Sequence, residues 1–229
     1  CCAKKPHYEN VDEYPMKQGS LDEMVYTPEK TSFSVWSPNA DSVYLNIYAD
    51  ATTAAPLQTL RMCRQKDGSW VKTVKGDLNG QYYTFKVVDA SSRWEMHETP
   101  GIFAKAVGVN GRRGAVIDLA STNPEGWAED VRPAFGGAKD AIIYEMHHRD
   151  MTIHETSGVK NKGKFIGWTE HGTKTAEGYA TGIDHLVELG VTHVQILPSY
   201  DYGSVDETRL SDNKYNWGYD PVNYNAPDG

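Results

Sequence analysis

The chain has 229 residues, and its 23 lysines and arginines against 31 aspartates and glutamates give a formal net charge of −8. This length suits one or two domains, and the acidic balance argues against nucleic acid as a partner. No run of eighteen apolar residues is present, so no membrane-spanning helix is predicted. The six tryptophans and fourteen tyrosines fit either ordinary core packing or the recognition of sugar rings, for which aromatic faces offer flat apolar platforms.

The N-terminal residues allow two interpretations. Cys1, Cys2 and Cys63 form no disulfide framework and no CxxC metal pair, and the adjacent Cys1 and Cys2 are poorly placed to bridge each other. Residues 1–20 are polar and aperiodic, which predicts a tether. The Cys-Cys start indicates either a trimmed fragment or a bacterial lipoprotein with lipid on Cys1. The second would put the protein in the cell envelope, periplasmic or at the surface, with a lipid anchor as its contact with the membrane; a cytoplasmic location is the alternative.

Residues 21–120 are predicted to form an all-β, immunoglobulin-like β-sandwich. Short β-rich runs alternate with turn clusters, a pattern typical of two packed antiparallel sheets. Trp36 is interpreted as a core residue, and Trp70 and Trp94 as candidate platforms for a glucan. The predicted strands are 33–36, 43–48, 70–74, 82–88 and 115–119.

A linker rich in Pro, Gly and Asn, 121–137, separates the sandwich from a second region, 138–229. Nearly continuous apolar runs at 141–146 and 192–197 predict strands buried on both faces. Between them, after a loop at 152–175, a helix is expected over 182–189. Thr181 and Asp184 offer a weak capping box at its start, and Gly190 suits the position just past its end. Strand, helix and strand predict a parallel βαβ unit, and two such strands are the opening of a larger α/β fold.

Several motifs of the second region resemble those of α-amylase-family debranching enzymes. Residues 141–147, followed by Arg149 and Asp150, resemble the first barrel strand, and 190–198 resemble the second. The run Tyr-Asn-Trp-Gly-Tyr-Asp-Pro at 215–221 is similar to the signature of type I pullulanases in glycoside hydrolase family 13. The preceding sandwich is similar to carbohydrate-binding module family 48. His148 and Met151 depart from the usual residues beside the first strand.

This resemblance implies a β-sandwich followed by the first, truncated part of a (β/α)8 TIM barrel. It implies hydrolysis of α-1,6-glucosidic bonds in pullulan, starch and limit dextrins by a retaining mechanism, with α-glucan as the substrate. The catalytic carboxylates would lie beyond Gly229, so no residue of this chain is assigned as catalytic and the chain alone is predicted to be inactive. Its partner would be the remaining C-terminal part of the enzyme. An isoamylase or a glycogen-branching enzyme is the alternative within this class, and a noncatalytic α-glucan-binding module the alternative from another class.

The candidate substrate-binding residues lie in the loop after the second predicted strand, where barrel enzymes build their sites. Gly218 would let the backbone turn between two large rings. Tyr219 resembles the residue that stacks under the sugar at the cleavage point, with Asp220 beside it to accept hydrogen bonds from hydroxyl groups. Tyr224 is predicted to pack the loop, and Trp217 is left open between both roles. The predicted set is Tyr215, Asn216, Trp217, Tyr219 and Asp220.

Other polar residues are given structural roles. His147 and His148 are expected on opposite faces of a strand, which prevents them from chelating a metal as a pair. Arg149 and Asp150 are expected to form an ion pair that holds a loop. Asp201 and Asp206 have oxygen ligands suited to calcium, but two residues are too few to define a site. No cofactor is therefore required, no metal ligand is assigned, and calcium is left open.

Overall fold

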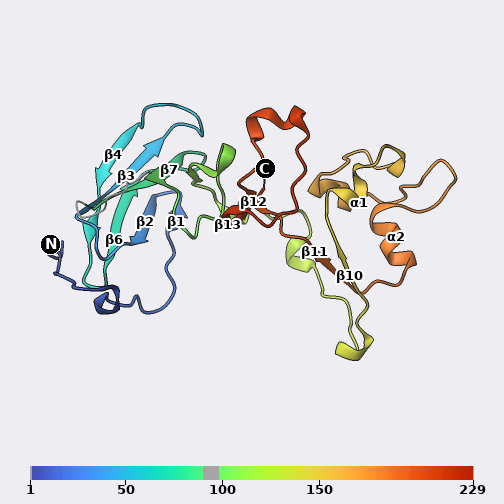
Figure 1. Cartoon of the computed structure of the whole chain (residues 1–229), viewed down its shortest axis with the longest axis horizontal. Helices are drawn as coiled ribbons and strands as arrows, with labels where there is room; N and C mark the ends of the chain where they lie inside the picture. The colour runs from blue at the N-terminus through green and yellow to red at the C-terminus, as the bar shows by residue number, and fades with distance from the viewer. Residues whose placement is uncertain (1, 90–97, 229) are drawn as a thin grey trace. The chain divides into compact units, whose positions relative to one another are not determined.

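The computed structural model describes residues 2–89 and 98–228, and they form two compact units (Figure 1). Unit 1 combines the chain up to residue 125 with 200–216 and 220 onwards, and unit 2 combines 126–199 with 217–219. Within the described ranges, no helix is both long and apolar enough to cross a membrane. The division of the sequence into tether, sandwich, linker and barrel start stays a prediction.

Unit 1 contains the β-sandwich. One sheet has the order β1-β2-β6-β5, and the other has the order β4-β3-β7-β8, with β9 also pairing with β7. The predicted strands at β2, β3, β6 and β7 are confirmed. The strand predicted at 115–119 is wrong beyond Ala115, because the chain turns into a 3-10 helix that Asp118 caps. The strands are β1 (Met24–Thr27), β2 (Lys30–Trp36), β3 (Ser42–Tyr48), β4 (Gln58–Arg61), β5 (Cys63–Arg64), β6 (Ser69–Lys75), β7 (Tyr82–Val88), β8 (Glu98–Thr99) and β9 (Gly114–Ala115).

Strand alternation decides which side chains enter the sandwich core. Phe33 and Val35 of β2 are buried, so Trp36 falls on the outer face and is 38% exposed. The prediction that Trp36 is a core residue is therefore wrong. Trp70 is 4% exposed, and its indole N–H donates to the carbonyl of Ser37 at 2.9 Å, so its predicted role as a glucan platform is wrong as well. Trp94 lies outside the described residues. The core also includes Val43, Leu45, Ile47, Met62, Val74, Leu78, Tyr83, Phe85, Val87 and Val116.

The N-terminal segment is attached to the sandwich. Although no disulfide framework was expected, a disulfide joins Cys2 to Cys63, 61 residues apart. Close by, the backbone N–H of Ala3 donates to the carbonyl of Arg64 at 2.8 Å. Two ion pairs add to this attachment, Lys5–Asp41 at 2.8 Å and Lys17–Asp67 at 3.1 Å. Cys1, the predicted lipid-bearing residue, lies outside the described residues.

Unit 2 contains a parallel strand pair. β10 (Ile143–Met146) pairs with β11 (His193–Ile196), and α2 (Gly182–Glu188) lies between them in the chain. These elements confirm the predicted strand–helix–strand order. A short helix, α1 (Asp150–Ile153), follows β10. The strands predicted to be buried on both faces are largely exposed here, with Ile143 at 64% and Ile196 at 45%.

The start of α2 differs from the expected capping box. Thr181 occupies the N-cap position, but its hydroxyl donates to the carbonyl of Ser157 and makes no cap hydrogen bond. The carboxylate of Asp184 instead accepts hydrogen bonds from the backbone N–H of Gly172 and from the ring of His171, both in the preceding loop. Thr181 and Asp184 therefore bond to residues of the preceding loop and not to the first turn of the helix. Gly190 has a φ of +74°, which confirms its place just after the helix.

The remaining regular segments are short. β12 (Tyr200–Tyr202) and β13 (Pro221–Pro227) pair antiparallel in unit 1, with register shifts. Short 3-10 helices occur at η1 (Val11–Glu13), η2 (Val109–Gly111), η3 (Leu119–Thr122), η4 (Trp127–Glu129), η5 (Ala138–Asp140), η6 (Glu155–Ser157), η7 (Phe165–Thr169) and η8 (Glu207–Asp212).

Candidate sugar-binding site

The segment between β12 and β13 carries the five residues predicted to bind sugar. Tyr215, Asn216 and Asp220 belong to unit 1, whereas Trp217 and Tyr219 belong to unit 2. The structure brings Asn216 and Asp220 directly together.

Asn216 holds the carboxylate of Asp220. Its side-chain amide donates to Oδ1 of Asp220 at 2.7 Å and to the hydroxyl oxygen of Ser204 at 2.6 Å. The backbone N–H of Gly203 donates to the carbonyl of Asp220 at 2.9 Å. Burial alone would raise the pKa of Asp220, but the hydrogen bonds from Asn216 and Ser204 hold that pKa below its ordinary value. Asp220 is therefore an ionised carboxylate at neutral pH, a form that can accept hydrogen bonds from hydroxyl groups.

The aromatic side chains of this segment are well exposed. Trp217 is 62% exposed and Tyr219 is 68% exposed. Such rings present the apolar faces on which the C–H side of a pyranose can stack. Tyr224 is 65% exposed, so the prediction that it packs the loop is wrong. On β13 the buried residues are Asn223 and Ala226, whereas the side chain of Tyr224 lies in solvent.

Gly218 adopts a left-handed backbone conformation and lies close to Pro198. Its φ is +88°, in the region that residues with a side chain rarely adopt. In unit 2, a Cβ atom on Gly218 would lie 1.9 Å from the carbonyl oxygen of Pro198. The prediction that glycine permits the turn at this position is confirmed.

The histidines after β10 form a stack. The rings of His147 and His148 lie 5.3 Å apart, and His148 also stacks on Phe165 at 4.4 Å. The expectation that they point to opposite faces is wrong, because β10 ends at Met146 and strand alternation ends with it. Burial lowers the pKa of His148, which favours the neutral, structural form. In the part of the chain that the structure describes, no group of three or more His, Cys, Asp or Glu residues could hold a metal.

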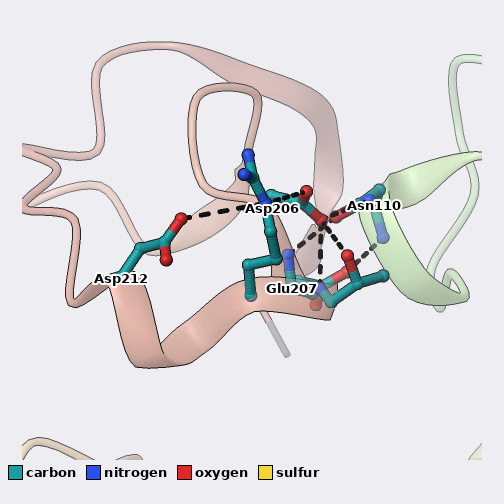
Figure 2. Close-up of polar contacts among 6 residues, drawn as sticks. Asn110, Asp206, Glu207 and Asp212 are labelled. Atoms are coloured by element: carbon teal, nitrogen blue, oxygen red, sulfur yellow. Dashed lines mark hydrogen bonds and ion pairs between the residues drawn. The ribbon is translucent and has the colours of Figure 1, made fainter.

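The ion pair between Arg149 and Asp150 is confirmed, with Nη1 and Oδ1 at 3.2 Å. The two aspartates considered for calcium are engaged elsewhere. Asp201 is 2% exposed and accepts a hydrogen bond from Asn223 at 2.6 Å. Asp206 accepts hydrogen bonds from Thr208 and Asn110, which hold its pKa far below the ordinary value (Figure 2).

Sequence reasoning missed the part of the sandwich that contacts the site segment. Asn110 bonds Asp206 and Glu207, and the carbonyl of Gly111 accepts from Asn223 at 3.1 Å. The Asn-Gly dipeptide at 110–111 signals a tight turn. It carries no information about a partner almost 100 residues away, since both contacts depend on the tertiary fold.

Comparison with known proteins relates both units to one group. Residues 19–100 match the family of carbohydrate-binding module 48 (isoamylase N-terminal domain). The chain is 42% identical over 205 residues to the pullulanase of Bacillus subtilis (strain 168), covering 90% of this chain and 27% of that protein. The crystal structure of Paenibacillus barengoltzii pullulanase in complex with maltohexaose and α-cyclodextrin superposes with a TM-score of 0.89 at 46% identity, covering 95% of this chain and 33% of that one.

A second solved structure, the pullulanase of Bacillus acidopullulyticus, gives a TM-score of 0.88 at 39% identity, covering 95% of this chain and 26% of that one. In each of the three comparisons with a pullulanase, the likeness spans 90% or more of the present sequence. The chain therefore spans about a quarter to a third of the length of the relatives it matches.

Proposed function

Because the chain belongs with the pullulanases of glycoside hydrolase family 13, as the region that carries their carbohydrate-binding module 48, we propose that the complete enzyme hydrolyses α-1,6-glucosidic bonds in pullulan, starch and limit dextrins. The observation that carries this proposal is the extent of the likeness. It covers 95% of the chain in a pullulanase structure that holds maltohexaose and α-cyclodextrin, well beyond the residues of the binding module. An α-glucan is the corresponding substrate here.

Unit 2 would supply the opening of a (β/α)8 barrel. Its parallel strands β10 and β11 with α2 between them are one βαβ repeat, and their exposed apolar residues offer a surface for further strands and helices. In such a barrel, the segment after β11 belongs to the face that binds substrate. This assignment supports Tyr219 as a stacking platform and Asp220 as an acceptor for hydroxyl groups.

The proposed chemistry is retaining hydrolysis. It needs a carboxylate nucleophile and a carboxylic acid/base about 5–5.5 Å apart, and we assign neither to this chain. Both would come from the remainder of the enzyme. The reaction as proposed requires no cofactor.

Pullulan distinguishes the complete enzyme from this region alone. The complete enzyme is expected to release maltotriose from pullulan, because this polymer joins maltotriose units through α-1,6 bonds. The 229-residue chain is expected to release no reducing sugar above a buffer control. Release by this chain alone would overturn the assignment of the carboxylates, and an inactive complete enzyme would overturn the function.

An isoamylase is the second candidate, since the matching module family also takes its description from isoamylases. Debranching of glycogen or amylopectin by the complete enzyme, with no product from pullulan, would favour that alternative. Binding of α-glucan without cleavage of any of these polymers would favour a noncatalytic module.

The disulfide supports a location outside the reducing cytosol. Disulfides such as Cys2–Cys63 persist in oxidising compartments and are rare in cytosolic proteins. We therefore propose a location in the cell envelope, periplasmic or at the surface. Alkylation of the native protein tests this: a Cys63 that reacts with iodoacetamide before reduction would favour the cytoplasm.

A further inference from the structure

We propose that Asn110 is a positioning residue for the sugar-binding segment, which makes the sandwich a support for substrate binding. The inference rests on the proposed function, because it assigns residues 203–220 to the binding of α-glucan. Asn110 lies in the sandwich loop between β8 and β9, and it contacts this segment in unit 1. Its role is to fix the segment, without touching the sugar.

Asn110 and Glu207 form a reciprocal pair (Figure 2). The side-chain oxygen of Asn110 accepts from the backbone N–H of Glu207 at 2.8 Å, and the backbone N–H of Asn110 donates to the carboxylate of Glu207. The side-chain amide of Asn110 also donates to Oδ1 of Asp206 at 3.0 Å. One asparagine thus uses its backbone donor and both ends of its side chain on two consecutive residues.

The backbone of this loop is shaped to make these contacts. Asn110 has a φ of +55° and Gly111 a φ of +64°, both in the left-handed region. Asparagine is one of the few residues with a side chain that adopt this region readily. A Cβ atom on Gly111 would lie 2.0 Å from Oδ2 of Asp201 and 2.4 Å from Nδ2 of Asn223, so the loop lies directly against β12 and β13. Both positions therefore restrict the residues that preserve the contact.

The contacted residues connect to the sugar-binding side chains. Asp206 also accepts from Thr208, at the start of η8, and pairs with Arg209. Two residues earlier, Ser204 accepts the amide of Asn216, which holds Asp220. These polar contacts hold a segment whose regular structure is limited to η8. Fixing residues 206 and 207 reduces the ordering that the segment would otherwise undergo when a glucan binds.

The test compares two Asn→Gly variants in the complete enzyme. N110G keeps the left-handed backbone accessible and removes the side-chain contacts. N39G is the matched control, because the amide of Asn39 bonds Asp89 within the sandwich at 3.0 Å. E207Q removes the charge opposite the backbone N–H of Asn110. The measurements are hydrogen–deuterium exchange of residues 203–216 and the kinetic constants for pullulan.

For N110G we expect exchange in 203–216 to be faster by about tenfold. The KM for pullulan should rise about three- to tenfold, with kcat changed less than about twofold, because binding is lost more than chemistry. E207Q should shift both quantities in the same direction, and N39G should shift neither.

Three results would overturn the inference: unchanged exchange in N110G, faster exchange with an unchanged KM, or an equal effect in N39G. If the unaltered enzyme fails to cleave pullulan, the proposed function falls by itself. The affinity for maltotetraose by calorimetry then replaces KM, and an N110G affinity equal to that of the unaltered enzyme would overturn the role of Asn110.

Discussion

The side-chain amide of Asn223 donates a 2.6 Å hydrogen bond to Oδ2 of Asp201, and both residues are buried. Burial raises the pKa of Asp201 above 3.8, and the neighbouring charge of Glu207 adds to the shift, while the bond from Asn223 opposes it. A carboxyl group with a raised pKa binds its proton more tightly in the folded state. Its contribution to stability therefore falls as pH rises from the ordinary value through the raised one.

An amide at this position would remove that dependence. The variant D201N keeps an oxygen for Asn223 and does not titrate. We expect the free energy of unfolding of D201N, relative to that of the unaltered protein, to increase as pH rises from about 4 to about 7. Urea unfolding at a series of pH values measures this difference, with the exposed Asp130→Asn as the control. Parallel pH profiles for D201N and the unaltered protein would contradict the assignment.

Loss of the Cys2–Cys63 disulfide should destabilise the sandwich. The bridge closes a loop of 61 residues, and cross-links of this kind contribute about 2–4 kcal/mol, largely by restricting the unfolded chain. C63S should therefore lower the free energy of unfolding by about this amount. Reduced but otherwise unaltered protein should match C63S, and the reductant should not affect C63S itself. A reductant-insensitive unaltered protein would show that the bridge does not contribute.

Tyr219 and Tyr224 are a matched pair for testing the stacking role. Both are tyrosines near the end of the described chain, with exposures of 68% and 65%. In the complete enzyme, Y219A should lose about 1–3 kcal/mol of transition-state binding, which is roughly 5- to 150-fold in kcat/KM. Y224A should stay close to the unaltered value. Equal and small losses in both variants would remove Tyr219 from the site.

The strands of unit 2 should be weakly protected in the chain by itself. Ile143 is 64% exposed and Ile196 is 45% exposed, and apolar side chains left in water contribute little to stability. We expect rapid hydrogen exchange at 143–146 and 193–196 in the isolated 229-residue chain and slow exchange in the complete enzyme. Slow exchange in an isolated chain that is monomeric would show that unit 2 folds without further strands.

The sandwich strands that could be predicted are those long enough to alternate. β2, β3, β6 and β7 have seven residues each, so inward and outward positions are visible in the sequence. β5, β8 and β9 have two residues each and leave no period to detect. Trp36 is exposed and Trp70 is buried, which is the reverse of the burial predicted for the two rings. The alternation of Phe33 and Val35 already indicated an outward Trp36.

In the candidate site too, features within one contiguous segment could be predicted, whereas contacts between distant residues could not. The run at 215–221 is contiguous, so its resemblance to a signature and the turn at Gly218 could be seen directly. The bonds of Asn110 to Asp206 and Glu207 join residues almost 100 positions apart, and no local pattern indicates them. The start of α2 is a second example. The sequence predicted a capping box with Asp184, but Asp184 accepts hydrogen bonds from His171 and Gly172 of the preceding loop, which no local pattern indicates.

Unit 1 is discontinuous in sequence, and this has a consequence for its synthesis. The strands of the sandwich end at Ala115, whereas β13, which completes the same unit, begins at Pro221. A ribosome that adds about 5–20 residues per second needs roughly 5–20 s to make the intervening stretch. Asp206 and Glu207, the partners of Asn110, are made late in that interval, after residues 126–199 of unit 2. The strands of the sandwich are therefore made well before β12 and β13, and the contacts of Asn110 with Asp206 and Glu207 can form only late in the synthesis of this sequence.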